Sequence, residues 1–285
     1  MFMMIDKRKR LLRVVGMAIV LVSLIAVCIG CQQHEEFSWD DVRLLPTYGS
    51  VNCFGDQKLE INLGLMTKAC HEDAFLSDFE TVTEIPTNLP MLRLVPQSIG
   101  VSGSNSQYSC YTLVAELQFS ALPEEQQTLE MLYIGEREFA LGSLMIVPYE
   151  VRERPDGFKV MSASGAAFGL GLAPYLAELK VTGQNVTIDE VVLPAYPESD
   201  VTMTGTQETI ELEINAVSAE DAVIYYLSPI IRYHENGEAK EYALEYFTCG
   251  VFLQAGDVSK IVEILGACSV DNAKIHGCFN GNFLR

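Results

Sequence analysis

The feature of this chain that most constrains its fold is a two-residue alternation of apolar and polar side chains. The alternation is clearest in residues 58–65, 111–119 and 209–215. Successive side chains of a β-strand point to opposite faces of the sheet, so each segment predicts a strand with one buried and one solvated face. Antiparallel sheets that pack on one side only are built from such strands.

Turn residues separate the predicted strands at the spacing of an all-β domain. Gly135-Glu136 predicts one hairpin, and Asn236-Gly237 is the favoured sequence of a type I′ hairpin turn. About a dozen strand-like segments follow one another with turn signals every 8–12 residues or so, which predicts sandwiches or barrels. We expect no long amphipathic helix. Residues 70–79 fit a short helical turn, and residues 257–265 fit either a short helix or the end of a strand pair.

Length and composition predict two domains. The chain has 285 residues, about two domains' worth, and its 49% apolar and 20% charged residues are typical of globular proteins. A turn at Pro155-Asp156-Gly157 and a stretch rich in Ser, Ala and Gly at 162–171 interrupt the strand pattern. We therefore predict two antiparallel β-sandwich domains, residues 47–165 and 166–285. The glycine-dense part, 165–171, lacks the Gly-Lys-Ser/Thr of a phosphate loop and is interpreted as a connector.

The charge balance argues against one class of partner. The chain has 38 acidic and 19 basic residues, a net charge of −19. Such a surface is repelled by a phosphate backbone, so nucleic acid is not predicted as a partner.

The N-terminus has the layout of a secretory signal. A basic segment, 7–13, precedes the uncharged residues 14–30. The following run, Val27-Cys28-Ile29-Gly30-Cys31, resembles the lipobox of bacterial lipoproteins, although that family usually has Leu where this chain has Cys28. The resemblance implies that residues 1–30 are a signal peptide, that Gly30 precedes the cleavage site and that the Cys31 thiol carries a diacylglycerol. Membrane lipid is thus an expected partner.

An uncleaved anchor helix is the alternative to the lipoprotein signal. Its uncharged segment would span about 25 Å, slightly less than the ~30 Å hydrocarbon core of a bilayer. Both interpretations keep the basic segment in the cytoplasm and place the rest of the chain outside it. Cleavage would remove five basic residues and one acidic residue, leaving 14 basic and 37 acidic, a net charge of −23. Residues 31–46 are polar and acidic and predict a tether, unless Trp39 packs onto the first domain.

Residues 218–227 resemble the segment that enters strand F of immunoglobulin variable domains. In that family a Tyr four residues after an Asp forms a tyrosine corner, and Tyr225 holds this place after Asp221. The resemblance implies an Ig-like second domain in which the Tyr225 hydroxyl bonds to nearby backbone. The family's cysteine is replaced here by Leu227. The alternative for this segment is a helix capped by Ser218.

Six cysteines follow Cys31, and an even number in an exported chain favours disulfides: Cys53, Cys70, Cys110, Cys249, Cys268 and Cys278. Proximity in sequence makes Cys53–Cys70 and Cys268–Cys278 the plausible local pairs. Buried free thiols in strands are the alternative. Cys268, His276 and Cys278 match no zinc-module spacing, so no metal site is predicted.

The sequence contains no recognisable catalytic constellation. Gly-x-Ser-x-Gly does not occur, and Cys70 and His71 are neighbours that would point to opposite faces of a strand. We therefore predict no catalytic, cofactor or metal residues, and Cys31 as the one site residue. The predicted role is a non-enzymatic surface binding, sensing or structural module with an unknown protein or glycan ligand. The alternative is a surface hydrolase or carbohydrate-active protein on the same scaffold. A solute-binding lipoprotein is less favoured, because those proteins alternate strands with helices.

Overall fold

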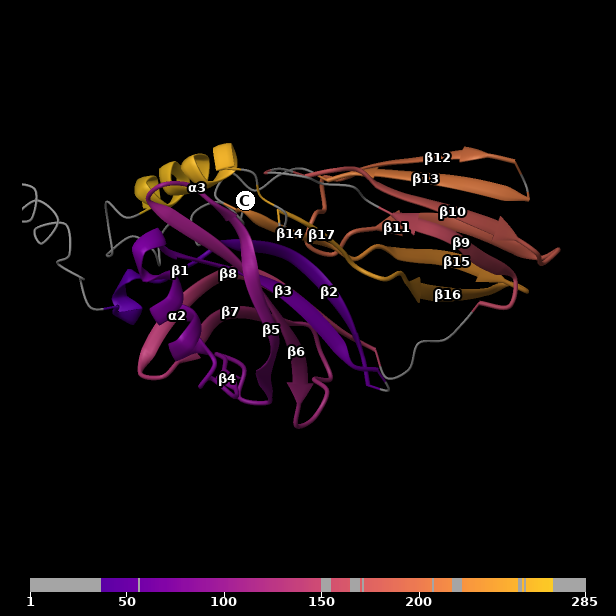
Figure 1. Ribbon diagram of the computed structural model, residues 1–285. Helices are drawn as coiled ribbons and strands as arrows, with labels where there is room; N and C mark the ends of the chain where they lie inside the picture. The colour runs from indigo at the N-terminus through magenta and orange to yellow at the C-terminus, as the bar shows by residue number, and fades with distance from the viewer. Residues whose placement is uncertain are drawn as a thin grey trace, which may run out of the picture. The chain divides into compact units, whose positions relative to one another are not determined.

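A computed structural model describes residues 37–55, 57–149, 155–164, 170, 172–206, 208–216, 222–250, 253 and 255–268. The structure is 58% strand and 12% helix, which confirms the predicted all-β class. The described residues from Ser38 onward belong to one compact unit, and their strands form four sheets (Figure 1).

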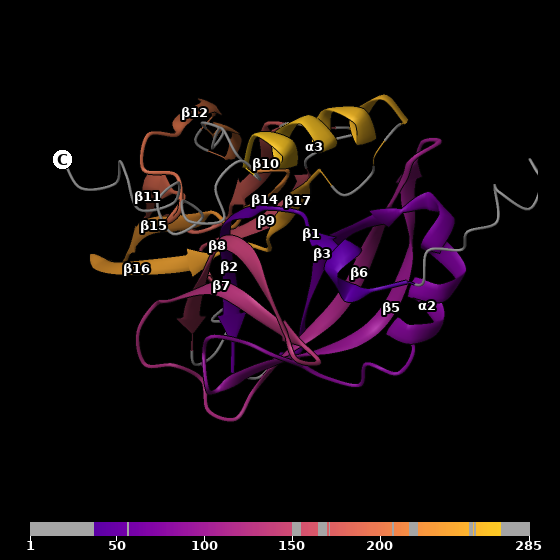
Figure 2. The same cartoon turned by 90° about the vertical axis from the view of Figure 1, so that its left-hand side faces the viewer.

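Two five-stranded sheets are built mainly from the N-terminal half. The first is antiparallel and contains, in spatial order, β1 (Arg43–Leu44), β3 (Leu59–Lys68), β6 (Tyr108–Phe119), β5 (Leu92–Ser104) and β4 (Ile85–Pro86). The second contains β17 (Phe247–Cys249), β14 (Ile224–Leu227), β2 (Thr47–Phe54), β8 (Arg137–Tyr149) and β7 (Gln127–Ile134). Figure 2 shows the two sheets on opposite sides of this region, and a bridge between Thr87 and Leu132 joins their edges.

Strand β2 departs from the predicted antiparallel arrangement. It lies in the middle of its sheet and pairs in parallel with β14 on one side and β8 on the other. Both faces of β2 are largely buried. Burial on both faces is typical of parallel strands and removes the alternation of apolar and polar residues. The sequence pattern therefore does not predict β2.

The other two sheets form a sandwich (Figure 1). One contains β12 (Asp200–Gly205), β13 (Thr209–Asn215), β10 (Tyr175–Val181) and β9 (Phe158–Ser164), and the other contains β11 (Val186–Val192), β15 (Ile230–Glu235) and β16 (Glu238–Ala243). Buried side chains from both sheets share one core, among them Leu179 and Leu212 from the first and Ile231 and Tyr233 from the second. The predicted boundary near residue 165 falls between β9 and β10, which pair with each other. The division into two domains stays a prediction.

Strand β14 belongs to two buried regions at once. Tyr225 and Leu227 pack in the core of the sandwich. Tyr226 points the other way, as alternate residues of a strand do, and its hydroxyl donates to the Asn62 carbonyl in β3 at 2.7 Å. The Tyr225 hydroxyl donates to the Ala222 carbonyl at 2.9 Å, which confirms the predicted bond to nearby backbone. Residues 224–227 form a strand rather than the alternative helix.

The clearest sequence patterns correspond to strands and turns in the structure. The three alternating segments fall in β3, β6 and β13. Ile134 pairs with Arg137 across the predicted turn at Gly135-Glu136. In the second hairpin, Asn236 and Gly237 have φ values of 53° and 87°, the left-handed values that a type I′ turn needs.

Helices are short in the described part of the chain. They are η1 (Trp39–Asp41), η2 (Ala69–His71), α2 (Glu72–Phe79) and α3 (Ala255–Cys268). α2 corresponds to the helical turn predicted at 70–79. Residues 257–265, which fit either a helix or the end of a strand pair, lie in α3 and are helical. Val258 and Ile261 of α3 are buried. Within the described ranges, no helix has the length and apolar character needed to cross a bilayer.

Part of the predicted tether is folded. The indole of Trp39 lies with its ring centre 5.9 Å from that of Phe75 and 6.2 Å from those of Phe79 and Phe139. Its Nε1 donates to the Asp78 carboxylate at 2.6 Å. Aromatic burial and this hydrogen bond hold the segment against α2 and β8, so residues 38–46 are not a tether. The alternative, in which Trp39 packs onto the first domain, is confirmed.

The described cysteines are free thiols. Cys53 lies buried in β2 and Cys70 lies exposed in η2, so the predicted Cys53–Cys70 disulfide is wrong. The alternative of buried thiols in strands is confirmed for Cys53, Cys110 and Cys249. The predicted Cys268–Cys278 pair lies outside the described side chains.

We expect thiol reagents to distinguish Cys70 from the buried cysteines. Burial raises the pKa of Cys53 and of Cys110 to about 12, so neither has an appreciable thiolate fraction at about pH 8. Alkylation of the folded protein, read by peptide mass spectrometry, should label Cys70 and leave the other two until denaturant is added. Labelling of Cys53 as fast as Cys70 in the folded protein would contradict its buried position.

Candidate binding site

Charged side chains gather on the outer face of the three-stranded sheet β11-β15-β16. In β15, Ile231 and Tyr233 are buried in the sandwich core, whereas Arg232 and His234 are exposed. Residues directly opposite each other in antiparallel strands lie on the same face. Arg232 is opposite Glu190 in β11 and opposite Glu241 in β16. The strand register therefore places two carboxylates on either side of one guanidinium.

Arg232 binds both carboxylates. Its Nη1 lies 2.7 Å from Glu190 Oε1, and its Nε lies 2.8 Å from Glu241 Oε1. A planar guanidinium presents several N–H groups in a fixed geometry, so it can hold two acceptors at once. The hydrogen bonds that Arg232 donates to Glu190 and Glu241 raise its pKa. The side chain is thus held charged and in one orientation across the three strands.

His234 pairs with the acid beside Glu190. Its Nδ1 lies 2.6 Å from Asp189 Oδ2. The register of β11 shifts between Ile188 and Glu190, which inserts Asp189 as an extra residue. Such a bulge changes the direction of side chains, and here Asp189 and Glu190 both reach side chains of the outer face.

A fourth pair lies towards the hairpin turn. Lys240 Nζ is 2.7 Å from Glu235 Oε2, and only 8% of the Glu235 side chain is exposed. The hydrogen bond that Lys240 donates to Glu235 raises the pKa of Lys240. A carboxylate that is almost fully buried needs such a partner, so this pair has a structural reason as well.

These residues line an open hollow of about 400 Å³, formed by Asp189, Glu190, Arg232, Tyr233, His234, Ala239, Lys240 and Glu241. The volume falls in the range of small-molecule sites, about 300–1,000 Å³. Its lining includes both basic and acidic side chains, which supply hydrogen-bond donors and acceptors.

An aromatic pair lies where β2 and β8 end. The rings of Phe54, at the end of β2, and Tyr149, at the end of β8, stack with centres 5.5 Å apart and planes inclined by 27°. Burial raises the pKa of Tyr149 to about 12. Burial is the largest cause of this shift; the charge of Glu241 contributes to it, and that of Arg232 opposes it. The phenol is therefore within electrostatic reach of the two central residues of the hollow.

The arrangement is suited to binding. The residues lining the hollow include no Ser, Thr or Cys. In the described part of the chain, no group of three or more His, Cys, Asp or Glu residues is placed to hold a metal ion. What the hollow offers is a set of fixed donors and acceptors.

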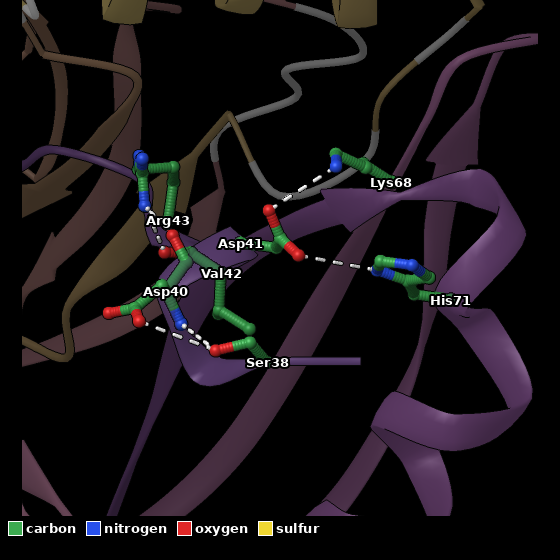
Figure 3. Close-up of polar contacts among 7 residues, drawn as sticks. All are labelled: Ser38, Asp40, Asp41, Val42, Arg43, Lys68 and His71. Carbon is green, nitrogen blue, oxygen red and sulfur yellow. Dashed lines mark hydrogen bonds and ion pairs between the residues drawn. The ribbon is translucent and has the colours of Figure 1, made fainter. Parts of the chain in front are cut away.

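A second polar cluster fastens the N-terminal segment (Figure 3). The Asp41 carboxylate lies 3.4 Å from Lys68 Nζ and 3.6 Å from His71 Nδ1. Arg43 Nη1 donates to the Asp40 carbonyl at 2.6 Å. These contacts tie η1 and β1 to β3 and η2, and His71 is buried beneath them. We assign this cluster a structural role.

The site residue that the sequence predicts, Cys31, lies outside the described residues, as does His276. The hollow itself is not predicted by the sequence analysis. One signal could have found half of it, because the Asn236-Gly237 turn fixes the hairpin register and so places Arg232 opposite Glu241. The pairing of Glu190 and Asp189 with β15 is long-range and passes through a bulge, and nothing in the sequence marks it.

Comparisons with known proteins add little beyond the fold class. No known protein family matches the sequence, and no curated protein matches it. Similar solved structures include an endo-fucoidan hydrolase from glycoside hydrolase family 107, with 11% identity, 75% of this chain and 30% of that chain covered, and a TM-score of 0.21. A tandem of titin Ig domains has 11% identity, 72% and 93% coverage, and a TM-score of 0.19. The chain spans about a third of the hydrolase's length. Both resemblances are weak.

Proposed function

We propose that this protein is a bacterial lipoprotein, anchored by Cys31 on the outer side of a membrane, whose hollow binds a ligand without transforming it. The observation that carries the binding role is the hollow on β11-β15-β16, where the contacts of Arg232 with Glu190 and Glu241 and of His234 with Asp189 hold donors and acceptors in place. The lipobox-like run before Cys31 supports the anchor.

The ion pairs of Arg232 do little for the stability of the sheet. The Arg232, Glu190 and Glu241 side chains are 48%, 53% and 46% exposed. Exposed pairs of this kind contribute about 0–1 kcal/mol each. Basic residues are also scarce in this part of the chain, since residues 155–250 contain four Lys and Arg in total. Two of these four, Arg232 and Lys240, line the hollow. Lys240 pairs with the buried Glu235, whereas both partners of Arg232 are exposed, so recognition of a ligand accounts for Arg232 better than folding does.

The anchor is tested by replacing each of the two neighbouring cysteines. In bacteria fed a fatty-acid analogue, we expect Cys31→Ala to abolish labelling of the protein completely, because the acylated thiol is gone. The matched control, Cys28→Ala, should be labelled as the natural sequence is. Labelling that survives in Cys31→Ala, or disappears in Cys28→Ala, would contradict the assignment of Cys31.

Ligand binding is tested without knowing the ligand. Hydrogen exchange of the full chain in lipid nanodiscs, with and without a soluble envelope fraction, should show protection in β11, β15 and β16. The exposed Arg93–Glu84 pair on the first sheet, 3.0 Å apart, provides a control variant, Arg93→Ala. We expect this protection to persist in Arg93→Ala and to disappear in Arg232→Ala. If the envelope fraction did not slow hydrogen exchange in β11, β15 and β16, the assignment of the hollow as the binding site would be wrong.

A further inference from the structure

We propose that the protein forms a two-fold symmetric dimer in which β12 pairs antiparallel with β12 of a second copy of the chain. β12 is an edge strand, and among the described residues it pairs with β13 alone (Figure 1). The side of an edge strand that faces away from its sheet presents unpaired backbone N–H and C=O groups, which can pair with another chain. This inference depends neither on the hollow nor on the lipid anchor.

The other edge strands of the described sheets carry features that discourage pairing with another chain. Such features are short length, register irregularities, and charged residues or Pro. β1, β4 and β17 have only two or three residues, and β7, β9 and β11 each pair with their neighbour through a register shift. β16 has three charged residues among its six. β12 has six residues, a regular register and one charged residue, Asp200, at its start. It is therefore the least protected edge in the described part of the chain.

The sequence of β12 is complementary to itself in an antiparallel pairing centred on Met203. Residues directly opposite each other in antiparallel strands share a face of the sheet, so this centre places Met203 against the partner's Met203 and Thr202 against the partner's Thr204. Thr–Thr pairs of this kind form hydrogen bonds across the strands. Asp200 would lie opposite the partner's Thr206, so the pairing brings no like charges face to face. A contact of this symmetry closes after two copies.

Met203 is an exposed apolar side chain that this pairing would bury. It lies opposite Leu212 of β13, which is 2% exposed in the sandwich core, so both side chains are on the inner face of the sheet. Met203 is nevertheless 43% exposed, because no described strand lies beyond β12. Val201, two residues earlier on the same face, packs against the core. The partner's Met203 would cover Met203 and continue the apolar core across the contact.

The acidic residues next to β12 favour a second copy only because the pairing keeps them apart. Glu211 and Glu213, which are exposed on β13, lie opposite Thr204 and Thr202. Strands lie about 4.8 Å apart, so the β13 strands of the two copies would be separated by three spacings, roughly 14 Å. This exceeds the Debye length of about 8 Å at physiological ionic strength. A basic extended segment of another protein is the alternative occupant, and the complementarity of β12 to itself favours the second copy.

The contact is tested by Met203→Cys in the full-length protein, in membranes of bacteria that express it. Opposite residues of antiparallel strands have Cα atoms about 4.5–5.5 Å apart, a separation that a disulfide can bridge. We expect mild oxidation to link most of this variant into a covalent dimer on a non-reducing gel. The natural sequence controls for the native cysteines, and Met161→Cys in β9, where Met161 is 56% exposed, controls for random collisions. Equal linking in the two variants, or none in Met203→Cys, would overturn the proposal.

A change of charge at the same position tests the strength of the contact. In sedimentation of the detergent-solubilised full-length protein, Met203→Lys should weaken the dissociation constant of the dimer by about ten-fold or more, because it sets two like charges opposite each other. Met161→Lys should remain within about two-fold of the natural sequence. A mixture of the Met203→Lys and Met203→Glu proteins should regain association, because opposite charges then face each other. This recovery separates a lost contact from a lost fold.

The remaining outcomes also decide the matter. Each copy has a net charge of −19, so raising the salt concentration from about 0.05 M to 0.5 M should strengthen a dimer whose contact is uncharged. A dimer that salt weakens, or that Met203→Lys leaves unchanged, would have its contact elsewhere and would overturn the proposal. A protein that stays monomeric and protects β12 from hydrogen exchange only when a basic extended peptide is added would assign this edge to a different partner.

Discussion

Gly49→Ala is expected to lower the free energy of unfolding by about 3 kcal/mol or more, because a strained backbone position costs about 1–3 kcal/mol and the steric overlap with β14 adds to this. Gly49 has a φ of 134° in β2, which an L side chain rarely adopts. A Cβ there would lie 2.1 Å from the carbonyl oxygen and 2.7 Å from the nitrogen of Tyr226. These atoms are backbone atoms of β14, the strand that pairs with β2, so they cannot move aside without breaking the pairing.

Urea unfolding monitored by the fluorescence of Trp39, the single tryptophan, measures this loss. The control is Gly100→Ala in β5, where a Cβ meets nothing within 4 Å. We expect the control to remain within about 0.5 kcal/mol of the natural sequence. If Gly49→Ala unfolded at the same urea concentration as Gly100→Ala, the close approach of β2 and β14 would be wrong.

Tyr226→Phe is expected to lower the free energy of unfolding by about 2 kcal/mol, the cost of leaving buried polar groups without a partner. The Tyr226 hydroxyl donates to the Asn62 carbonyl at 2.7 Å and accepts from the Asn62 N–H at 2.5 Å. β1 pairs only with Leu65 and Met66 of β3, so Asn62 lies beyond the end of β1. Burial raises the pKa of Tyr226, so its hydroxyl keeps the proton that it donates.

Tyr246→Phe is the matched comparison in the same unfolding assay. The Tyr246 hydroxyl donates to the Glu60 carbonyl in β3, two residues from Asn62. Tyr246 is half-buried, whereas Tyr226 is fully buried. Water can therefore replace the Tyr246 hydroxyl, and we expect a loss below about 1 kcal/mol. Equal losses in the two variants would show that the Tyr226 bond is not isolated from solvent.

The sequence predicts those strands whose two faces meet different surroundings. In β10 and β13 the buried and exposed residues alternate, and the alternation in the sequence of β13 is visible for this reason. β2 lies between parallel neighbours and is buried on both faces, so its sequence carries no period. The sequence of α3 does not distinguish a helix from a strand, because Ile261-Val262 and Ile264-Leu265 suit both. The structure forms a helix there, in which Val258 and Ile261 are buried.

The binding hollow depends on strand order, which local patterns do not contain. Arg232 and Glu190 are 42 residues apart in sequence and meet because β11 is the neighbour of β15. The Asn236-Gly237 turn predicts that Arg232 lies opposite Glu241 in the same hairpin. The turn does not predict that β11 is the neighbour on the other side of β15. The wrong disulfide has a similar cause, because closeness along the chain suggested Cys53 and Cys70, and the fold buries one and exposes the other.

The pairing of β2 with β14 has a consequence for how the chain reaches its native state. β2 ends at Phe54 and β14 begins at Ile224, so about 170 residues must emerge before this edge of β2 can be closed. Under the proposed export, the N-terminal end leaves the translocation channel first and is acylated early. The lipid would then hold a chain in which the five-stranded sheet that contains β2 is still incomplete. Such a chain offers an unpaired parallel edge to proteases and to neighbouring nascent chains, so envelope chaperones would be needed during this interval.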